Sequence, residues 1–165
     1  MTVPARPPEA EYTEVAIDGP ARAVFTTRRG GVSTGAWESL NLGANSGDRA
    51  EDVRSNRLAL ATGLGIDPAR VTMLHQVHGA DVLDIDRPTH DGLYGGDLLG
   101  WHEADGLATT VAGLPLMVLG ADCLPVLLWR RDRPGVAAAH AGWRGLVGGV
   151  LAAAVAALGD PASTG

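Results

Sequence analysis

The stretch GADCLPVLLWRRDRPGVAAAHAGWRG, residues 120–145, decides how the fold of this chain is interpreted. Two apolar runs, residues 124–129 and 135–140, flank a turn rich in arginine and proline, which is the pattern of two strands joined by a turn. Cys123 directly precedes the first run, and His140 ends the second. We therefore expect a thiol and an imidazole at strand ends, either as a nucleophile–base pair or as metal ligands.

The composition of the 165-residue chain narrows the classes of protein to consider. Its length suits one domain with a real core, and its net charge of −6 argues against nucleic acid or an anionic membrane as a partner. All 13 basic residues are arginine, which excludes lysine Schiff-base chemistry and a P-loop. Cys123 is the only cysteine, so an internal disulfide is excluded and a reducing, cytoplasmic compartment is favoured.

The pattern along the chain predicts an α/β or α+β domain over residues 15–165, preceded by a flexible lead-in over residues 1–14. A helix is predicted over residues 48–64, capped by Asp48 with Glu51 three residues on. A second helix over residues 145–158 is apolar on most sides and is expected to be buried. Glycine-rich or polar loops are predicted at residues 28–35 and 87–103. Strands are predicted at residues 23–27, 71–74, 81–85, 106–110, 116–119, 124–129 and 135–140.

Three of the predicted strand ends carry side chains that bind metals. His78, Cys123 and His140 would form a site of one thiolate and two imidazoles with a fourth position open, which is the catalytic pattern for zinc. Zinc in such a site lowers the pKa of bound water to about 7. The spacing matches no local zinc signature, and a buried cysteine is commonly a small hydrophobe, so the ligand and packing interpretations both stand.

Several other residues allow a functional and a structural interpretation. Arg28, in the glycine-rich loop, could hold an anion or form a solvated charge pair with Arg29. Asp122 could orient a histidine, bind a ribose hydroxyl or cap a turn. Trp143 is expected in the core, and His90 and His102 are expected in solvent. The motifs G-x-S-x-G, H-E-x-x-H and G-x-G-x-x-G are absent.

Six segments, in order along residues 23–158, together resemble the YfiH family. This family is also described as multicopper polyphenol oxidoreductase (laccase) or purine nucleoside phosphorylase-like, and the peptidoglycan editing factor belongs to it. The matching segments are TTRRGGVS (residues 26–33), LNLG (40–43), QVHG (76–79), ADGL (104–107), ADCLPV (121–126) and HAGWRG (140–145).

The resemblance implies a metal triad of His78, Cys123 and His140, holding zinc, with copper as the less favoured metal. It implies phosphorolysis of purine nucleosides to base and ribose 1-phosphate, with adenosine deamination as a second activity. The implied fold is a layered α/β arrangement of mixed sheets, shared with Cys–His toxin deamidases. Members usually continue past the last residue of this chain, so the domain is expected to be incomplete at its C-terminus.

Three functions are weighed on these residues. The first is a zinc-assisted enzyme on purine nucleosides and phosphate, with Arg28 holding phosphate and Asn41 fixing the nucleoside. The second is a metal-free Cys123–His140 amidohydrolase acting on a peptidoglycan precursor, in which His78 has no necessary role. The third is a non-catalytic domain. A phenol-oxidising laccase is disfavoured because multicopper oxidation needs more histidine ligands. Oligomeric state and the preferred nucleoside stay open.

Overall fold

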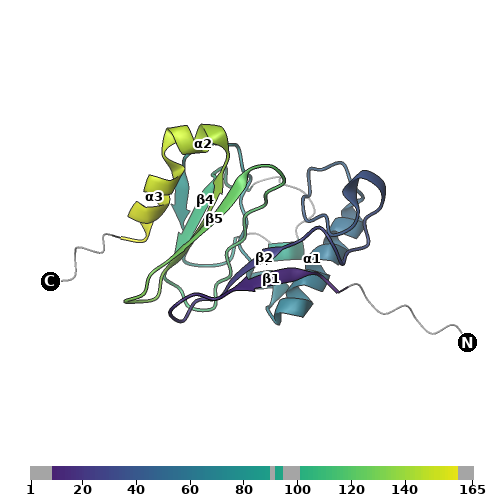
Figure 1. The fold of residues 1–165 in the computed structure, drawn as a ribbon, viewed down its shortest axis with the longest axis horizontal. Helices are drawn as coiled ribbons and strands as arrows, with labels where there is room; N and C mark the ends of the chain where they lie inside the picture. Colours follow the sequence, from purple (N-terminus) through teal and green to yellow (C-terminus); the bar gives the residue numbers. More distant parts are fainter. Residues whose placement is uncertain (1–8, 90–91, 95–100, 160–165) are drawn as a thin grey trace, which may run out of the picture.

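A four-stranded mixed sheet forms the centre of the fold (Figure 1). The computed structural model describes residues 9–89, 92–94 and 101–159. The sheet has the order β3-β4-β6-β5; β3 runs parallel to β4, and the other neighbours are antiparallel. These strands are β3 (Val82–Asp84), β4 (Gly106–Thr109), β5 (Leu124–Trp129) and β6 (Val136–Ala141). The mixed α/β class predicted from the sequence is confirmed.

A separate two-stranded ribbon precedes this sheet. β1 (Tyr12–Val15) pairs antiparallel with β2 (Ala23–Thr26). β1 begins inside the predicted flexible lead-in, whose first eight residues lie outside the described part of the chain. The strand is held in place because β2 satisfies its backbone, and because the Tyr12 hydroxyl donates to the Gly63 carbonyl at 3.1 Å.

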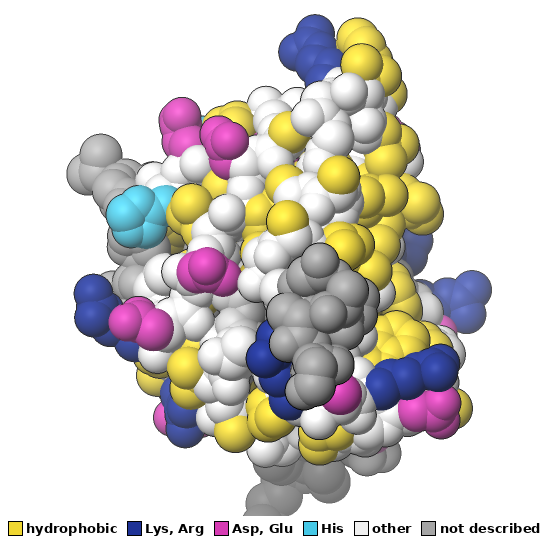
Figure 2. Space-filling model, turned by 90° about the vertical axis from the view of Figure 1, so that its left-hand side faces the viewer, with side chains coloured by type: hydrophobic (Ala, Val, Ile, Leu, Met, Phe, Trp, Pro, Cys, Tyr) yellow, Lys and Arg dark blue, Asp and Glu magenta, His cyan; other side chains and the backbone are white. Residues whose placement is uncertain are grey.

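The predicted C-terminal helix is two helices, α2 (Trp143–Gly148) and α3 (Val150–Ala157). Gly149 separates them with a φ of +91°, a left-handed conformation that glycine adopts without steric cost. The expected burial on most sides was wrong, since Leu146 is 45% exposed, Val147 is 85% exposed and Val155 is 51% exposed. Only one side of α3 faces the sheet. Figure 2 looks at the α2–α3 side of the molecule and shows hydrophobic side chains gathered there.

Small residues let α3 approach the sheet closely, where it packs on β6, β3 and β4. An alanine side chain is a single methyl group, so it leaves room for the helix backbone close to the strand. The core between helix and sheet is therefore filled by closely packed small side chains rather than by bulky ones. The buried residues of this core are Ala108, Ala137, Ala139, Ala141, Val150, Ala154 and Leu158.

The first predicted helix is confirmed as α1 (Ala50–Leu64), which ends at Gly65 in a left-handed conformation. The predicted cap was wrong: Arg49 occupies the N-cap position, and no side chain caps the helix. Asp48 lies one residue too early, and its carboxylate accepts hydrogen bonds from the Arg49 amide and from Asn41 instead. Asp48 therefore fixes the loop that leads into the helix.

Two of the predicted strands, residues 71–74 and 116–119, are not strands. These segments are extended, but they pair only through an isolated parallel bridge between Thr72 and Leu116. Three short 3-10 helices interrupt the loops. η1 (Gly35–Trp37) begins at the last residue of the predicted loop 28–35, η2 (Pro68–Arg70) follows α1, and η3 (Gly92–Tyr94) lies within the predicted loop 87–103. Within the described residues, none of the helices has the length and apolarity needed to cross a membrane.

Candidate functional site

Three side chains of the kinds that can ligate a metal converge at one end of the central sheet. The ligand atoms of His78, Cys123 and His140 all lie within 4.8 Å of one another. His140 sits near the end of β6, Cys123 directly precedes β5, and His78 lies in the loop before β3. The antiparallel pairing of β5 with β6 places Pro125 opposite His140, which brings Cys123 to the same end. The two imidazole rings meet edge to face, with centroids 4.8 Å apart.

Asp105, a fully buried carboxylate, connects the two histidines. Its Oδ1 accepts from the His78 amide at 2.9 Å and contacts Nδ1 of His140 at 2.7 Å. Its Oδ2 accepts from the amides of Val77 at 3.1 Å and Gly79 at 2.6 Å. His78 has a φ of +61°, which is unfavourable for a residue with a side chain, and these hydrogen bonds hold it there.

The charge on Asp105 sets the chemistry of His140. Burial raises the pKa of this carboxyl, but the hydrogen bonds from His140 and from the three amides outweigh it and hold the pKa below its usual range. An ionised Asp105 only accepts hydrogen bonds, so Nδ1 of His140 carries the proton and donates it. Nε2 of His140 is then left with a lone pair for a metal ion, as in carboxylate–histidine–metal arrangements.

Gly142 keeps the space among the three ligands open. A Cβ at this position would lie 3.1 Å from His78 Cδ2, 3.2 Å from Cys123 Sγ and 3.7 Å from His140 Cε1. The missing side chain therefore leaves a gap that touches all three residues, in addition to a donor set that suits zinc. The residues present fit a single metal ion bound by one thiolate and two imidazoles.

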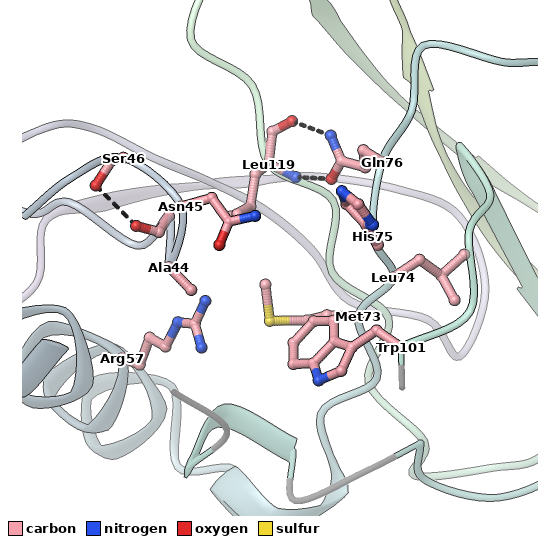
Figure 3. A pocket seen from close by; sticks show the side chains of 11 residues that line it. Ala44, Asn45, Ser46, Arg57, Met73, Leu74, His75, Gln76, Trp101 and Leu119 are labelled. Atoms are coloured by element: carbon pink, nitrogen blue, oxygen red, sulfur yellow. Dashed lines mark hydrogen bonds between the residues drawn. The ribbon is translucent and has the colours of Figure 1, made fainter. Parts of the chain in front are cut away.

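A cavity of about 340 Å³ lies between α1 and the segment that leads to His78 (Figure 3). One wall is the segment Met73 to Gln76, and the opposite wall comes from the loop before α1 and from α1 itself. The Gln76 side chain joins this wall to Leu119 by two hydrogen bonds of 2.7 Å. The lining residues are Gly43, Ala44, Asn45, Ser46, Arg57, Met73, Leu74, His75, Gln76, Trp101 and Leu119.

Comparison with known proteins identifies the family. The family described as multi-copper polyphenol oxidoreductase laccase matches residues 22–164. The chain belongs to this family. Its resemblance to the YfiH proteins, expected from the sequence motifs, is thereby confirmed.

Relatives in this family carry names that refer to nucleosides. The chain is 47% identical over 136 residues to a purine nucleoside phosphorylase of Streptomyces coelicolor, covering 82% of this chain and 53% of the relative. It is 42% identical over 138 residues to the purine nucleoside phosphorylase YfiH of Escherichia coli, covering 84% of this chain and 53% of the relative. The chain thus spans about half the length of the curated relatives it matches.

Solved structures of family members share the fold. A Neisseria meningitidis protein superposes with a TM-score of 0.76 and 39% identity, covering 92% of this chain and 58% of that one. The hypothetical protein YfiH of Bacillus licheniformis superposes with a TM-score of 0.75 and 34% identity, covering 82% of this chain and 51% of that one. The layered α/β arrangement implied by the resemblance is therefore confirmed.

The residues predicted to bind substrate lie in different places in this family member. Asp122 is exposed in the bend beside Cys123. Arg28 is exposed, and its Nε donates to the Glu38 carbonyl at 2.7 Å. Asn41 donates to Ser46 at 2.6 Å and to Asp48 at 3.0 Å, so its amide shapes the loop that lines the cavity. Neither Arg28 nor Asn41 is among the described residues that line the cavity.

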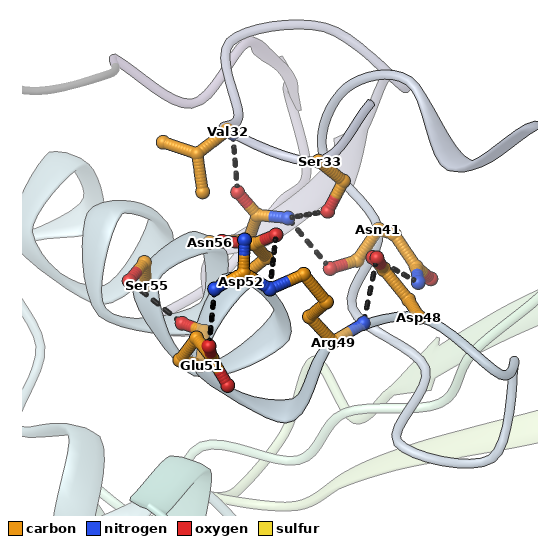
Figure 4. A network of polar contacts seen from close by, with 9 residues as sticks. All are labelled: Val32, Ser33, Asn41, Asp48, Arg49, Glu51, Asp52, Ser55 and Asn56. Carbon is orange, nitrogen blue, oxygen red and sulfur yellow. Dashed lines mark hydrogen bonds and ion pairs between the residues drawn. The ribbon is translucent and has the colours of Figure 1, made fainter. Parts of the chain in front are cut away.

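A polar network on α1 holds these loops in place (Figure 4). Asn56, fully buried, accepts from the Val32 amide at 2.7 Å and donates to the hydroxyl of Ser33 at 2.8 Å. Its amide also donates to the carbonyls of Ser39 and Asn41. The hydrogen bonds from Ser33 and Asn41 lower the pKa of Asp48. The glycine-rich segment is thus held against α1 by these hydrogen bonds.

None of the other described histidines, nor Trp143, belongs to the His78–Cys123–His140 cluster. Residue His90 lies outside the described residues, and His102 is exposed as expected. His75 lines the cavity and faces Glu103 at 3.6 Å. Trp143 was expected in the core but is exposed, with the Arg144 guanidinium 5.3 Å from the centre of its ring. Its position at the start of α2 turns it away from the sheet.

Sequence reasoning missed Asp105 and Arg57. Asp105 lies between a buried alanine and the first residue of β4, so a carboxylate directly before an apolar strand was the available signal. Arg57 lies at helical spacing from Val53 and Leu60, which places it on the buried face of the helix. A charged residue on such a face is unusual, and this was the available signal.

Substituting Gly142 by alanine is expected to weaken metal binding about tenfold while the chain stays folded, because the added Cβ displaces ligands by a few tenths of an ångström. Isothermal titration of zinc into the metal-free protein measures this affinity. Gly63→Ala is the control, because it adds the same methyl group at an exposed helical position of α1, where the Cβ makes only an ordinary 3.6 Å contact with Tyr12. Unchanged zinc affinity in Gly142→Ala would show that the ion does not sit in the gap beside Gly142.

Proposed function

We propose that this chain carries the metal centre of a zinc-dependent purine nucleoside phosphorylase with adenosine deaminase activity. The observation that carries the proposal is the convergence of His78, Cys123 and His140 around the gap at Gly142. The names of the relatives support the substrate class of purine nucleoside and phosphate. Because the chain spans about half of those relatives, the activity is proposed for the whole protein of which this fold is the matching part.

Each residue of the triad has a role that follows from its surroundings. His140, buried and fixed by Asp105, is the rigid ligand, and His78 is exposed, so the centre opens to solvent on its side. Cys123 is half-buried and binds as the thiolate. Zinc bound there would supply Lewis-acid activation of water, phosphate or the leaving purine. Deamination and phosphorolysis would then share one set of ligands.

The proposal extends to substrate contacts near the triad and to the cellular compartment. Asp122, which is exposed beside Cys123, is proposed to bind a ribose hydroxyl. Arg28 and Asn41 are proposed to contact phosphate and nucleoside from the loops packed on α1. The single cysteine suits the reducing conditions of the cytoplasm.

A second candidate function is favoured by the pair His140–Asp105. A cysteine beside a histidine that an aspartate orients is also the arrangement of metal-free amidohydrolases, in which the thiolate attacks a carbonyl. Here the substrate would be the amide of a peptidoglycan precursor. This function needs Cys123, His140 and Asp105 but assigns no step to His78.

The two functions are distinguished by measuring metal content and turnover together. For the phosphorylase we expect about one zinc per chain by mass spectrometry, and release of free base and ribose 1-phosphate that requires phosphate and stops on chelation. His78→Ala should lose both zinc and turnover. Amide hydrolysis that survives chelation and His78→Ala, yet stops with iodoacetamide, would contradict the phosphorylase and establish the amidohydrolase.

A further inference from the structure

The side chain of Gln76 supports the segment of chain that leads to Cys123. Its Nε2 donates to the Leu119 carbonyl at 2.7 Å, and its Oε1 accepts from the Leu119 amide at 2.7 Å (Figure 3). One carboxamide therefore satisfies both backbone groups of a single residue, as a neighbouring strand would. Two hydrogen bonds also fix the orientation of Leu119, which a single hydrogen bond would leave free to turn.

This contact continues a short parallel pairing between two backbone segments. The Thr72 amide donates to the Pro115 carbonyl at 2.9 Å, and the Met117 amide donates to the Thr72 carbonyl at 2.9 Å. In a parallel pair the next amide along, that of Leu119, would donate to the backbone of the opposite segment. It donates to the side chain of Gln76 instead. Gln76 thus replaces the next step of the pairing and holds the two segments together up to the triad.

The bend that carries Cys123 is fixed only at its two ends. Within the described part of the chain, residues 120–123 make no hydrogen bond. The bend begins after Leu119, which Gln76 holds, and it ends at Leu124, which pairs with β6. The position of the thiol therefore depends on a side-chain contact at one end and on the sheet at the other.

The two histidines of the triad have a separate support. The buried Asp105 accepts hydrogen bonds from the amides of Val77, His78 and Gly79, and it contacts the ring of His140. None of these contacts involves Gln76. A group that supports only the thiol should act on metal binding through the thiol alone.

We infer that Gln76 is a positioning residue of the metal centre, which holds the Cys123 bend beside His78 and His140 before an ion binds. The inference rests on the metal centre of the proposed function but on no nucleoside reaction. Holding a ligand in place beforehand removes the cost of ordering the bend when the ion binds. Loss of the carboxamide should therefore weaken zinc binding through Cys123 and leave the support of the two histidines intact.

The test combines zinc titrations with a double-mutant cycle. Gln76→Met removes both hydrogen bonds at similar side-chain length, and Gln76→Glu keeps the acceptor but loses the donor. Each substitution is made in the wild type, in Cys123→Ala and in His78→Ala, and the residual zinc affinity is measured by calorimetry at higher zinc concentrations. Tyr12→Phe is the control, because it removes a hydrogen bond to the Gly63 carbonyl from a ribbon that contributes no residue to the triad. Circular dichroism is recorded for every variant.

We expect zinc to bind about tenfold more weakly, or weaker still, in Gln76→Met, as for other groups that orient a metal ligand. The same substitution should lower the residual affinity of His78→Ala but not that of Cys123→Ala, because the carboxamide acts through the thiol. In the metal-free protein, ¹⁵N relaxation should show larger motion at the Cys123 amide and unchanged motion at the His78 amide. Tyr12→Phe should bind zinc as the wild type does. If Gln76→Met fails to fold, Gln76→Glu, which keeps one of the hydrogen bonds, decides the matter.

Two results would overturn the inference. One is unchanged zinc affinity in folded Gln76→Met protein; the other is an equal loss of affinity in the wild type and in Cys123→Ala, which would show a general structural effect. Phosphorolysis together with wild-type zinc affinity in Gln76→Met rejects this role of Gln76 and leaves the proposed phosphorylase intact. The expected pattern of zinc affinities without any nucleoside turnover supports Gln76 and counts against the phosphorylase.

Discussion

Cys123→Ala protein is expected to purify without zinc and to lose nucleoside turnover. The loss of a group that merely orients a metal ligand costs about 10- to 100-fold in affinity, so the loss of the thiolate itself should cost more than about 100-fold. The fold should persist, because Cys123 precedes β5 and contributes no hydrogen bond to the sheet register that begins at Leu124. Metal content by mass spectrometry and phosphate-dependent release of free base measure the two losses together.

The neighbouring residue supplies the control for this experiment. Leu124 is 61% exposed, so Leu124→Ala makes a similar truncation one position along the chain without touching the triad. This variant should keep its zinc and its turnover. Zinc retained at full stoichiometry in Cys123→Ala would contradict the three-ligand centre, and turnover retained with it would contradict any role for the thiol.

Asp105→Asn is expected to weaken zinc binding about 10- to 100-fold and to destabilise the fold by about 2–4 kcal/mol. Each oxygen of the carboxylate accepts two hydrogen bonds, Oδ1 from His78 and His140, and Oδ2 from Val77 and Gly79. An asparagine turned either way presents its NH₂ group to two donors. Two of the four donors therefore lose their acceptor oxygen, although the side chain keeps its size.

Three measurements follow this substitution. Urea denaturation gives the stability, zinc titration gives the affinity, and ¹⁵N NMR reports which ring nitrogen of His140 carries the proton. Asp84→Asn is the matched control, since Asp84 is exposed on β3 in the neighbouring strand. A merely structural Asp105 would change stability but leave the His140 tautomer and the zinc affinity of the folded protein as they are.

The lowered pKa of Asp105 predicts how the stability difference between wild type and Asp105→Asn changes with pH. The folded pKa of Asp105 lies below its usual value because the hydrogen bonds from His140 and the backbone amides outweigh burial. A lowered pKa contributes stability above the unfolded pKa of about 3.9, and that contribution is lost as the pH falls through the folded pKa. The stability gap between wild type and Asp105→Asn should therefore be full near neutral pH and shrink below about pH 4.

The proposed metal ligands Cys123 and His140 were predictable because each lies at the end of a strand whose pattern is local. Cys123 and His140 adjoin apolar runs that alone indicate strands, and pairing those strands brings both residues to one end of a sheet. The break at Gly149 and the exposure of Trp143 were not predicted. Both depend on how much of the helical surface the sheet covers, which an apolar composition does not reveal.

The sequence by itself determined the family and the mixed α/β class, and it singled out His78, Cys123 and His140 as candidate ligands, since these follow from motifs and from local periodicity. Only the tertiary structure decided what supports them. Asp105 serves a loop 26–28 residues before it and a strand 35 residues after it, a relationship that no spacing rule contains. Arg57 became a cavity residue only when α1 packed against the segment that leads to His78. Long-range packing brings such groups together, because the energy that places them comes from contacts between distant parts of the chain.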